Sequence, residues 1–335
     1  MLGIIIHQMI KSRWIVMLAA ATICAFGVWN FQNLSIDAVP DITNVQVQIN
    51  TEAPGYSPLE AEQRITFPIE TALSGLPQLS YTRSLSAYGL SQVTVVFEEG
   101  TDIYFARNLV NSRLGPIKSR LPVGLEPQMG PISSGLGEIF MYTVRAEEGA
   151  IQANGEPHDL FSLREIQDWI IKRQLVLVDG VTEVNTSGGY EKQYHVTPDP
   201  SKLLRWEISM QQLVAALWDN NVNQGAGYIE RNGQQLMVRS PGQLSTIDEI
   251  ENVAILTRDS IPVRVKDVAE VSIGKELRTG AATRSGEEAV IGTAFMLLGE
   301  NSRSVARRVA EKLDEINISL PEGVVAEALY DRTVL

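Results

Sequence analysis

The chain has 335 residues, enough for two or three domains, and its 44% hydrophobic and 20% charged residues are typical of an ordered globular protein. The formal net charge of −12 argues against nucleic acid and against an anionic membrane surface as partners of the main body. The single cysteine, Cys24, lies in an apolar N-terminal stretch, so the rest of the chain has no disulfide, thiolate metal site or cysteine nucleophile.

The first element is an uncharged stretch, residues 14–36, whose first part is almost wholly apolar. A helix of roughly 20 apolar residues spans the hydrocarbon core of a bilayer, and tryptophans such as Trp14 and Trp29 favour its two interfaces. We therefore predict a transmembrane helix over residues 14–33. A cleaved signal peptide and a buried core helix are the alternatives. The apolar run exceeds the usual signal-peptide length of about 7–15 residues, and no A-x-A cleavage site follows it.

The charges that flank this stretch differ between its two sides. His7, Lys11 and Arg13 precede it without an acidic residue, whereas Asp37 and Asp41 follow it. Positive charge is retained on the cytoplasmic side of a membrane protein. We therefore expect a cytoplasmic N-terminus, residues 1–13, and a main body on the outer side of the plasma membrane, in contact with its lipid through the helix.

The region after the helix has the element order of a split βαβ unit. Alternating apolar residues predict strands at 45–49, 81–85, 92–97 and 125–129, with helices from Ser57 and from about Asp102. Ser57 and Glu60 form a capping box, and Pro68 should bend the helix that follows. The apolar stripe expected on that helix consists of Leu59, Ile65, Ile69 and Leu73. The order β-α-β-β-α-β is that of a ferredoxin-like fold.

A second copy of this strand-and-helix pattern begins near residue 135 and is interrupted half-way. A strand is predicted at 138–144, then a helix opened by a capping box, Ser162 with Glu165, then a strand at 181–185. The stripe expected on this helix consists of Leu163, Ile166, Ile170 and Leu177. The remaining strand, helix and strand follow only at 289–298, 304–317 and 324–329.

A repeat of 199 positions (299 − 100) supports two related units. Gly100 and Gly299 match, and so do the Leu-Pro-x-Gly turns that end in Gly124 and Gly323. The interruption, residues 190–274, then looks like an inserted α+β domain, since insertion at an exposed turn is tolerated. Inside it, Asn232-Gly233 between two apolar runs predicts a β-hairpin, either an arm for a neighbouring subunit or an ordinary solvated hairpin.

The motifs of common enzyme classes are missing from the sequence. It has no Gly-x-x-x-x-Gly-Lys-Ser/Thr phosphate loop and no Gly-x-Ser-x-Gly elbow, and its three histidines, His7, His158 and His195, lie far apart. We therefore expect neither an enzyme nor a bound cofactor. Two carboxylates remain of interest, Glu138 and Glu183, because the strands that carry them can lie side by side and a carboxylate pair could collect a divalent cation such as zinc or cobalt. The alternative is a solvated sheet edge with ordinary acids.

Several longer motifs resemble those of one known family. They are Ile36-Asp-Ala-Val-Pro-Asp-Ile-Thr-Asn-Val-Gln-Val47, Ala53-Pro-Gly-Tyr-Ser57, Tyr88-Gly-Leu-Ser-Gln-Val93, Met129-Gly-Pro-Ile-Ser133, Gly225-Ala-Gly-Tyr-Ile-Glu230 and Tyr330-Asp-Arg-Thr333. Together they resemble the N-terminal third of a resistance-nodulation-division efflux pump of the cobalt–zinc–cadmium type. The resemblance covers the whole chain.

The resemblance implies a domain plan. Residues 34–130 would be a first porter subdomain, and residues 131–187 with 275–330 a second, both ferredoxin-like. Residues 188–274 would be an inserted subdomain that docks the outer-membrane channel, and its hairpin would interlock with trimer neighbours. Residues 331–335 would begin the linker to a membrane domain. Glu138 would fall where the second porter subdomain lines the substrate cleft.

The resemblance also implies a function. Members of the family sit in the bacterial inner membrane with the porter body in the periplasm, and they export metal cations by proton influx. They work as homotrimers with a periplasmic adaptor and an outer-membrane channel. The proton-carrying membrane acids and the C-terminal porter half have no counterpart in this sequence, so we expect a fragment, one product of a split gene or a prematurely ended chain. The alternative is a stand-alone membrane-anchored periplasmic module that modulates a complete pump.

Overall fold

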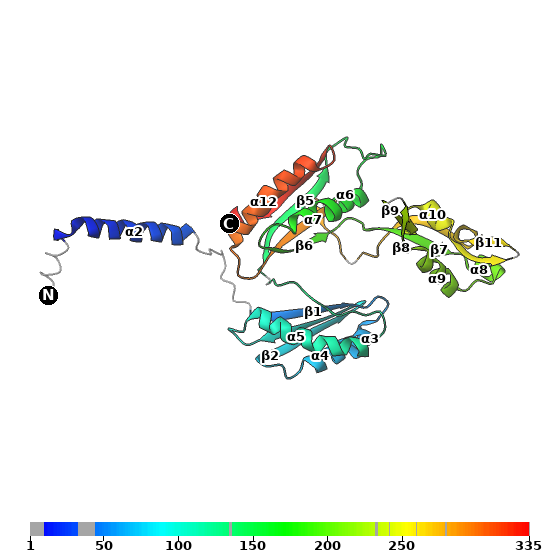
Figure 1. The fold of residues 1–335 in the computed structure, drawn as a ribbon, viewed down its shortest axis with the longest axis horizontal. Helices are drawn as coiled ribbons and strands as arrows, with labels where there is room; N and C mark the ends of the chain where they lie inside the picture. The colour runs from blue at the N-terminus through cyan, green and yellow to red at the C-terminus, as the bar shows by residue number, and fades with distance from the viewer. Residues whose placement is uncertain are drawn as a thin grey trace. The chain divides into compact units, whose positions relative to one another are not determined.

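A computed structural model describes residues 10–32, 44–133, 136–231, 234–240, 242–258, 260–278 and 280–334 (Figure 1). The chain divides into two compact units. The first comprises Met1–His158, Ile166–Gly188 and Ala282–Leu335, and the second comprises Asp159–Glu165 and Gly189–Ala281. The short segment Asp159–Glu165 therefore groups with residues that follow it at a distance in the sequence.

The N-terminal helix α2 (Arg13–Gln32) agrees with the predicted span of residues 14–33. Its segment Arg13–Asn30 is long and apolar enough to cross a membrane, and none of it is buried in the described structure. Trp14 is 72% exposed and Trp29 is 59% exposed. A helix of a soluble core would bury an apolar stripe, so the exposure of the whole helix argues against the core-helix alternative.

The first sheet and its helices follow one another without interruption (Figure 1). Its strands lie in the order β2-β3-β1-β4, and every neighbouring pair is antiparallel. One face of the sheet packs against the helices through a core that includes Ile49, Ile65, Ile69, Val93 and Val110. The elements in chain order are β1 (Gln46–Glu52), α3 (Pro58–Ala61), α4 (Phe67–Leu73), β2 (Leu79–Ala87), β3 (Leu90–Phe97), α5 (Ile103–Ile117) and β4 (Gln128–Met129).

Local signals explain where the first helix begins and how it accommodates a proline. The Ser57 hydroxyl accepts the N–H of Glu60, and the Glu60 carboxylate accepts the N–H of Ser57 at 3.0 Å, which completes the predicted capping box. A π-helical turn, Glu62–Thr66, lies directly before Phe67 and Pro68. Proline donates no N–H, so the regular α-helical bonding is interrupted beside this π-helical turn, and the bend expected at Pro68 stays a prediction. Leu59 was expected in the buried stripe but is 61% exposed, because the capping turn faces solvent and Ala61 is buried instead.

The second sheet has the same strand plan as the first. Its strands lie in the order β16-β5-β15-β6, so in both sheets the fourth, first, third and second strands of the unit are neighbours in that order. Gly100 and Gly299, the matched turn glycines, both have positive φ values, 83° and 91°. The elements are β5 (Glu138–Ala146), α6 (Leu160–Ile166), α7 (Lys172–Leu175), β6 (Val181–Ser187), β15 (Val290–Met296), α12 (Ser302–Ser319) and β16 (Val324–Asp331).

The first helix of this unit departs from the prediction in two ways. The carboxylate of Asp159, not the Ser162 hydroxyl, caps it by accepting the Ser162 N–H at 2.9 Å, so the helix begins at Leu160. A π-helical turn, Gln167–Ile171, joins α6 to α7. Its extra residue rotates the buried face, so Ile171 and Leu175 are 0% exposed, whereas Leu177, expected in the stripe, is 83% exposed.

The two π-helical turns carry the same kind of polar contact. Thr66 lies nine residues after Ser57, the residue that caps its helix (66 − 57). The Thr66 hydroxyl lies 2.8 Å from the hydroxyl of Ser86 on β2. Asp168 lies nine residues after Asp159 (168 − 159), and its carboxylate accepts the Thr186 hydroxyl of β6 at 2.6 Å. The internal repeat therefore extends to the first helix, where the sequence shows no match.

The second unit has its own small core. Strands β7 and β12 form one antiparallel pair, β10 and β11 another, and β8 and β9 the predicted hairpin, whose Asn232 and Gly233 lie outside the described residues. Leu213, Ile250, Val263 and Val268 lie at the centre of the core. The elements are β7 (Lys192–Pro198), α8 (Pro200–Trp206), α9 (Met210–Asn220), β8 (Gln224–Arg231), β9 (Gln234–Ser240), α10 (Ile247–Glu251), β10 (Ala254–Arg258), β11 (Ile261–Arg264), α11 (Val265–Val268) and β12 (Ala269–Lys275).

Candidate functional site

The two candidate carboxylates lie in one row of the second sheet but not on adjacent strands. Strand β15 separates β5, which begins at Glu138, from β6, which carries Glu183. Both glutamates pair with Phe295, one from each side. The expectation that the two strands lie side by side is therefore wrong. The order of a split βαβ sheet places the third strand between the first and second, so two strand spacings, about 10 Å, separate the two backbones.

This separation changes what the pair can do. Paired residues on neighbouring strands project to the same face, so Glu138, Phe295 and Glu183 belong to one face, and all three are partly exposed. Carboxylates on backbones this far apart would share an ion directly only if both side chains leaned toward each other across Phe295. Among the residues that the structure describes, no three His, Cys, Asp or Glu side chains are grouped to hold a metal.

A polar cavity of about 230 Å³ places Glu183 in a different setting. Glu183 is the charged residue among those that line it, and amides and a hydroxyl supply most of the remaining polar groups. The other lining residues are Gln46, Gln48, Asn50, Pro131, Ser133, Asn185 and Phe295. Glu138 is not among them. The volume far exceeds the ~30 Å³ that one water occupies in the liquid, so a cation could enter with part of its hydration shell.

Alternation along β1 builds one wall of this cavity. Val47 and Ile49 are buried in the core, which turns Gln46, Gln48 and Asn50 to the opposite face. Their amides are held in place. Asn50 Oδ1 accepts hydrogen bonds from Gln48 Nε2 at 3.0 Å and from Gln92 Nε2 at 3.2 Å. The sequence analysis missed these residues as site candidates, although the run Gln-x-Gln-x-Asn-x-Glu from Gln46 onward carried the signal.

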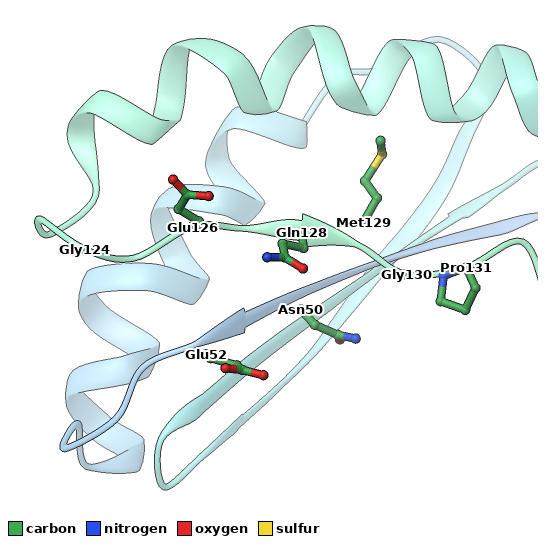
Figure 2. A pocket seen from close by; sticks show the side chains of 8 residues that line it. All are labelled: Asn50, Glu52, Gly124, Glu126, Gln128, Met129, Gly130 and Pro131. Atoms are coloured by element: carbon green, nitrogen blue, oxygen red, sulfur yellow. The ribbon is translucent and has the colours of Figure 1, made fainter. Parts of the chain in front are cut away.

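A second cavity, of about 500 Å³, adjoins the first sheet near β4 and shares Asn50 and Pro131 with the first cavity (Figure 2). Glu52 and Glu126 bring two carboxylates to it. Figure 2 shows Asn50 and Glu52 on β1, with Gln128 on the adjacent β4 and Glu126 on the segment before it. The carboxylates of Glu52 and Glu126 point in different directions in this view of the acidic cavity.

Known proteins resemble the chain over nearly its full length. Residues 5–335 match the profile of the AcrB/AcrD/AcrF family. The chain belongs to this family of resistance-nodulation-division transporters. A solved structure of a heavy metal efflux pump aligns with 96% of this chain and 31% of its own chain, at 31% identity and a TM-score of 0.85. The mixed helix-and-sheet fold is therefore that of a heavy-metal member of the family.

Three curated relatives indicate the branch of the family. Protein HelA of Legionella pneumophila is 61% identical over 100% of this chain and 32% of its own length. The cobalt-zinc-cadmium resistance protein CzcA of Cupriavidus metallidurans is 56% identical over 99% of this chain, and the cation efflux system protein CusA of Escherichia coli is 36% identical over 99%. The chain spans 31% of the length of each of these last two.

Proposed function

We propose that this chain is the N-terminal part of a proton-driven exporter of divalent heavy-metal cations of the zinc, cobalt and cadmium class. The observation that carries the proposal is its similarity, along its whole length, to metal efflux and resistance proteins. The cation is the substrate and not a resident cofactor. Oxygen and amide groups in the Glu183 cavity, with no cluster of methionine or cysteine, favour zinc, cobalt or cadmium over copper or silver.

The domain plan of the proposal follows the sequence repeat. Residues 34–130, and residues 131–187 with 275–330, would be the two ferredoxin-like porter subdomains. Residues 188–274 would be the inserted subdomain that docks an outer-membrane channel. The common strand plan of the two sheets supports this assignment. Helix α2 would anchor the chain in the inner membrane with residues 1–13 in the cytoplasm and the body in the periplasm, because positive charge precedes the helix.

The partners in the proposal are those of a tripartite pump. The chain would act in a homotrimer, together with a periplasmic adaptor, an outer-membrane channel and the remaining two thirds of the transporter. Co-purification from a bacterial membrane tests this part. A partner polypeptide that carries the membrane domain supports the transporter. Capture of a separate, complete pump would instead favour the modulator module.

Within the pump, we assign the first cation contact of this chain to Glu183 and its amide-lined cavity. Titration calorimetry of the full chain in detergent with Zn²⁺, Co²⁺ and Cd²⁺ tests the assignment. We expect Glu183→Gln to weaken binding at least tenfold, because the cavity loses its charged ligand. Glu138→Gln should have a smaller effect, since Glu138 does not line the cavity. Glu311→Gln, an exposed residue of α12, is the matched control and should change nothing. Unchanged heats for Glu183→Gln, alone and combined with Glu138→Gln, would refute the assignment.

A further inference from the structure

Tyr190 lies where the chain leaves the second sheet for the second unit. It follows β6 after two glycines in the left-handed region, Gly188 (φ 77°) and Gly189 (φ 67°). The space around position 188 also requires a glycine. A Cβ there would lie 2.1 Å from the carbonyl oxygen of Ala289 and 2.8 Å from the Cβ of Ala282, on the returning chain. The outgoing and returning chains therefore approach each other closely just before Tyr190.

Three chain segments that are distant in sequence meet at the Tyr190 side chain and its backbone. Its N–H donates to the carbonyl of Leu160 at 3.4 Å, and its ring lies 5.1 Å from that of Phe161, both in the first turn of α6. On the returning chain, Lys275 Nζ lies 4.5 Å from the ring centroid and the Arg278 guanidinium carbon 4.9 Å. Arg278 Nη1 also donates to the tyrosine hydroxyl at 3.2 Å.

The backbone beside the ring joins the outgoing and returning chains. The N–H of Glu276 donates to the carbonyl of Glu191 at 3.1 Å, which continues the antiparallel pairing of β7 and β12 past Lys192 and Lys275. A tyrosine ring attracts cations through its negative face, and this ring binds two of them together with a second aromatic ring. The first turn of α6, the outgoing chain and the returning chain are therefore tied together at one residue.

This arrangement accounts for an otherwise unexpected feature of the fold. Asp159–Glu165 belongs to the second unit, although helix α6 continues through Ile166 into the first unit. The π-helical turn Gln167–Ile171 follows directly. Such turns are wider than the α-helix and are frequent at functional positions. The helix is thus bound to the insert at its start and has its irregular turn just beyond the point where it enters the first unit.

We propose that the contacts of Tyr190 with α6 and with the returning chain, called the joint below, couple the first turn of α6 to the inserted unit. That turn then opens and moves with the inserted unit and not with the sheet to which the rest of the helix belongs. A displacement of the inserted unit or of the second sheet would then be transmitted along α6. The proposal concerns motion only and does not depend on which substrate the protein carries.

Hydrogen exchange of the full chain in detergent, with increasing low concentrations of urea, tests the joint. In the wild type, the amides of residues 160–165 should open together with those of the β7–β12 ladder. In Tyr190→Leu, exchange at residues 160–165 and at Glu276 should rise at least tenfold while the ladder stays protected, and residues 160–165 should then open together with α7. Tyr190→Phe keeps the ring contacts and loses only the hydrogen bond from Arg278, so exchange should stay within about threefold of wild type.

Trp169→Leu is the matched control. Trp169 is also an aromatic residue of this helix with an arginine stacked on it, Arg173 at 4.1 Å, but it lies outside the joint, so Glu276 should be unaffected. Tyr190→Leu could lose amide protection throughout the insert because the insert unfolds. The double variant Lys275→Gln with Arg278→Gln then tests the joint, because it removes the two cations and leaves the tyrosine ring in place. It should raise exchange at Glu276 and residues 160–165 about threefold. Unchanged exchange there, or opening of residues 160–165 together with α7 in the wild type, would overturn the proposal.

Discussion

Replacing Gly292 by alanine tests how tightly the second sheet is packed against its helices. Gly292 lies on β15 directly opposite Tyr142 on β5. An added Cβ would lie 2.2 Å from Cζ and 2.4 Å from the hydroxyl oxygen of Tyr142. Carbon atoms in contact are ordinarily about 3.5–4.0 Å apart, so the ring would have to retreat by more than about 1 Å. Tyr142 is 0% exposed, so the ring cannot retreat into solvent without disturbing the core around it. Burial also raises the pKa of its hydroxyl above the ordinary value.

The size of the effect follows from two opposing contributions. Overpacking a well-filled core costs typically about 1–3 kcal/mol, and a rigid, fully buried ring places this site at the upper end. Alanine recovers about 0.5–1 kcal/mol because it loses less backbone entropy than glycine on folding. We expect a net loss of about 2–2.5 kcal/mol. Gly115 in α5 is the matched control. Apart from its chain neighbours, it has no heavy atom within 4 Å of an added Cβ. The gain in helix propensity of about 1 kcal/mol is opposed by the clash of a Cβ with the ring of the following Pro116, so Gly115→Ala should change the stability by less than about 1 kcal/mol.

Hydrogen exchange of the β5 and β15 amides in the full chain measures the free energy of opening of the second sheet. Gly292→Ala should speed their exchange roughly 30- to 60-fold, since about 1.4 kcal/mol corresponds to a factor of ten. Adding Tyr142→Leu should recover part of the loss, because the smaller side chain vacates the space. If Gly292→Ala were neutral or stabilising, the close approach of Tyr142 to β15 would be wrong.

Two further predictions concern pH and helix capping. Hydrogen bonds from Arg284 and then Arg145 hold the pKa of the Glu327 carboxyl below its ordinary value of 4.5. A lowered folded-state pKa contributes stability above the unfolded pKa that is lost as the pH falls through the folded one. The stability of the sheet that contains β16, measured by thermal unfolding between pH 3 and 7, should therefore decrease once the pH is lowered past about 4.5. Glu327→Gln should flatten that pH dependence. Equal pH dependence in both proteins would contradict the account. Ser57→Ala, which removes the acceptor for the Glu60 N–H, should cost about 0.5–2 kcal/mol in urea unfolding, and an unchanged midpoint would show that the capping box is not stabilising.

The sequence predicted well the features that depend on a few neighbouring residues. Alternation from Val45 onward predicted β1, and Ser57 with Glu60 predicted the start of the first helix, because capping bonds join groups three residues apart. Gly100 and Gly299 predicted matching turns, since a left-handed backbone favours glycine in any surroundings. The apolar and uncharged N-terminal stretch likewise predicted α2.

Periodicity failed where a helix is not regular. The stripe predicted through Ile170 and Leu177 assumed 3.6 residues per turn along the whole helix. The π-helical turn adds a residue, and the core receives Ile171 and Leu175 instead. Nothing in the local sequence marks that turn, because the partly buried hydrogen bond between Thr186 and Asp168 that accompanies it joins residues 18 positions apart.

The sequence by itself determined which segments become most of the strands and helices, and it predicted that one pattern occurs twice with an insert in the second copy. Only the tertiary structure decided that β15 separates Glu138 from Glu183, and that Glu183 shares its cavity with amides of β1. The physical reason is the sequence separation over which each kind of interaction acts. Caps, turns and alternation act within a few residues, whereas strand order and cavity walls depend on the packing of segments more than a hundred residues apart, whose side chains carry no local sign of their partners.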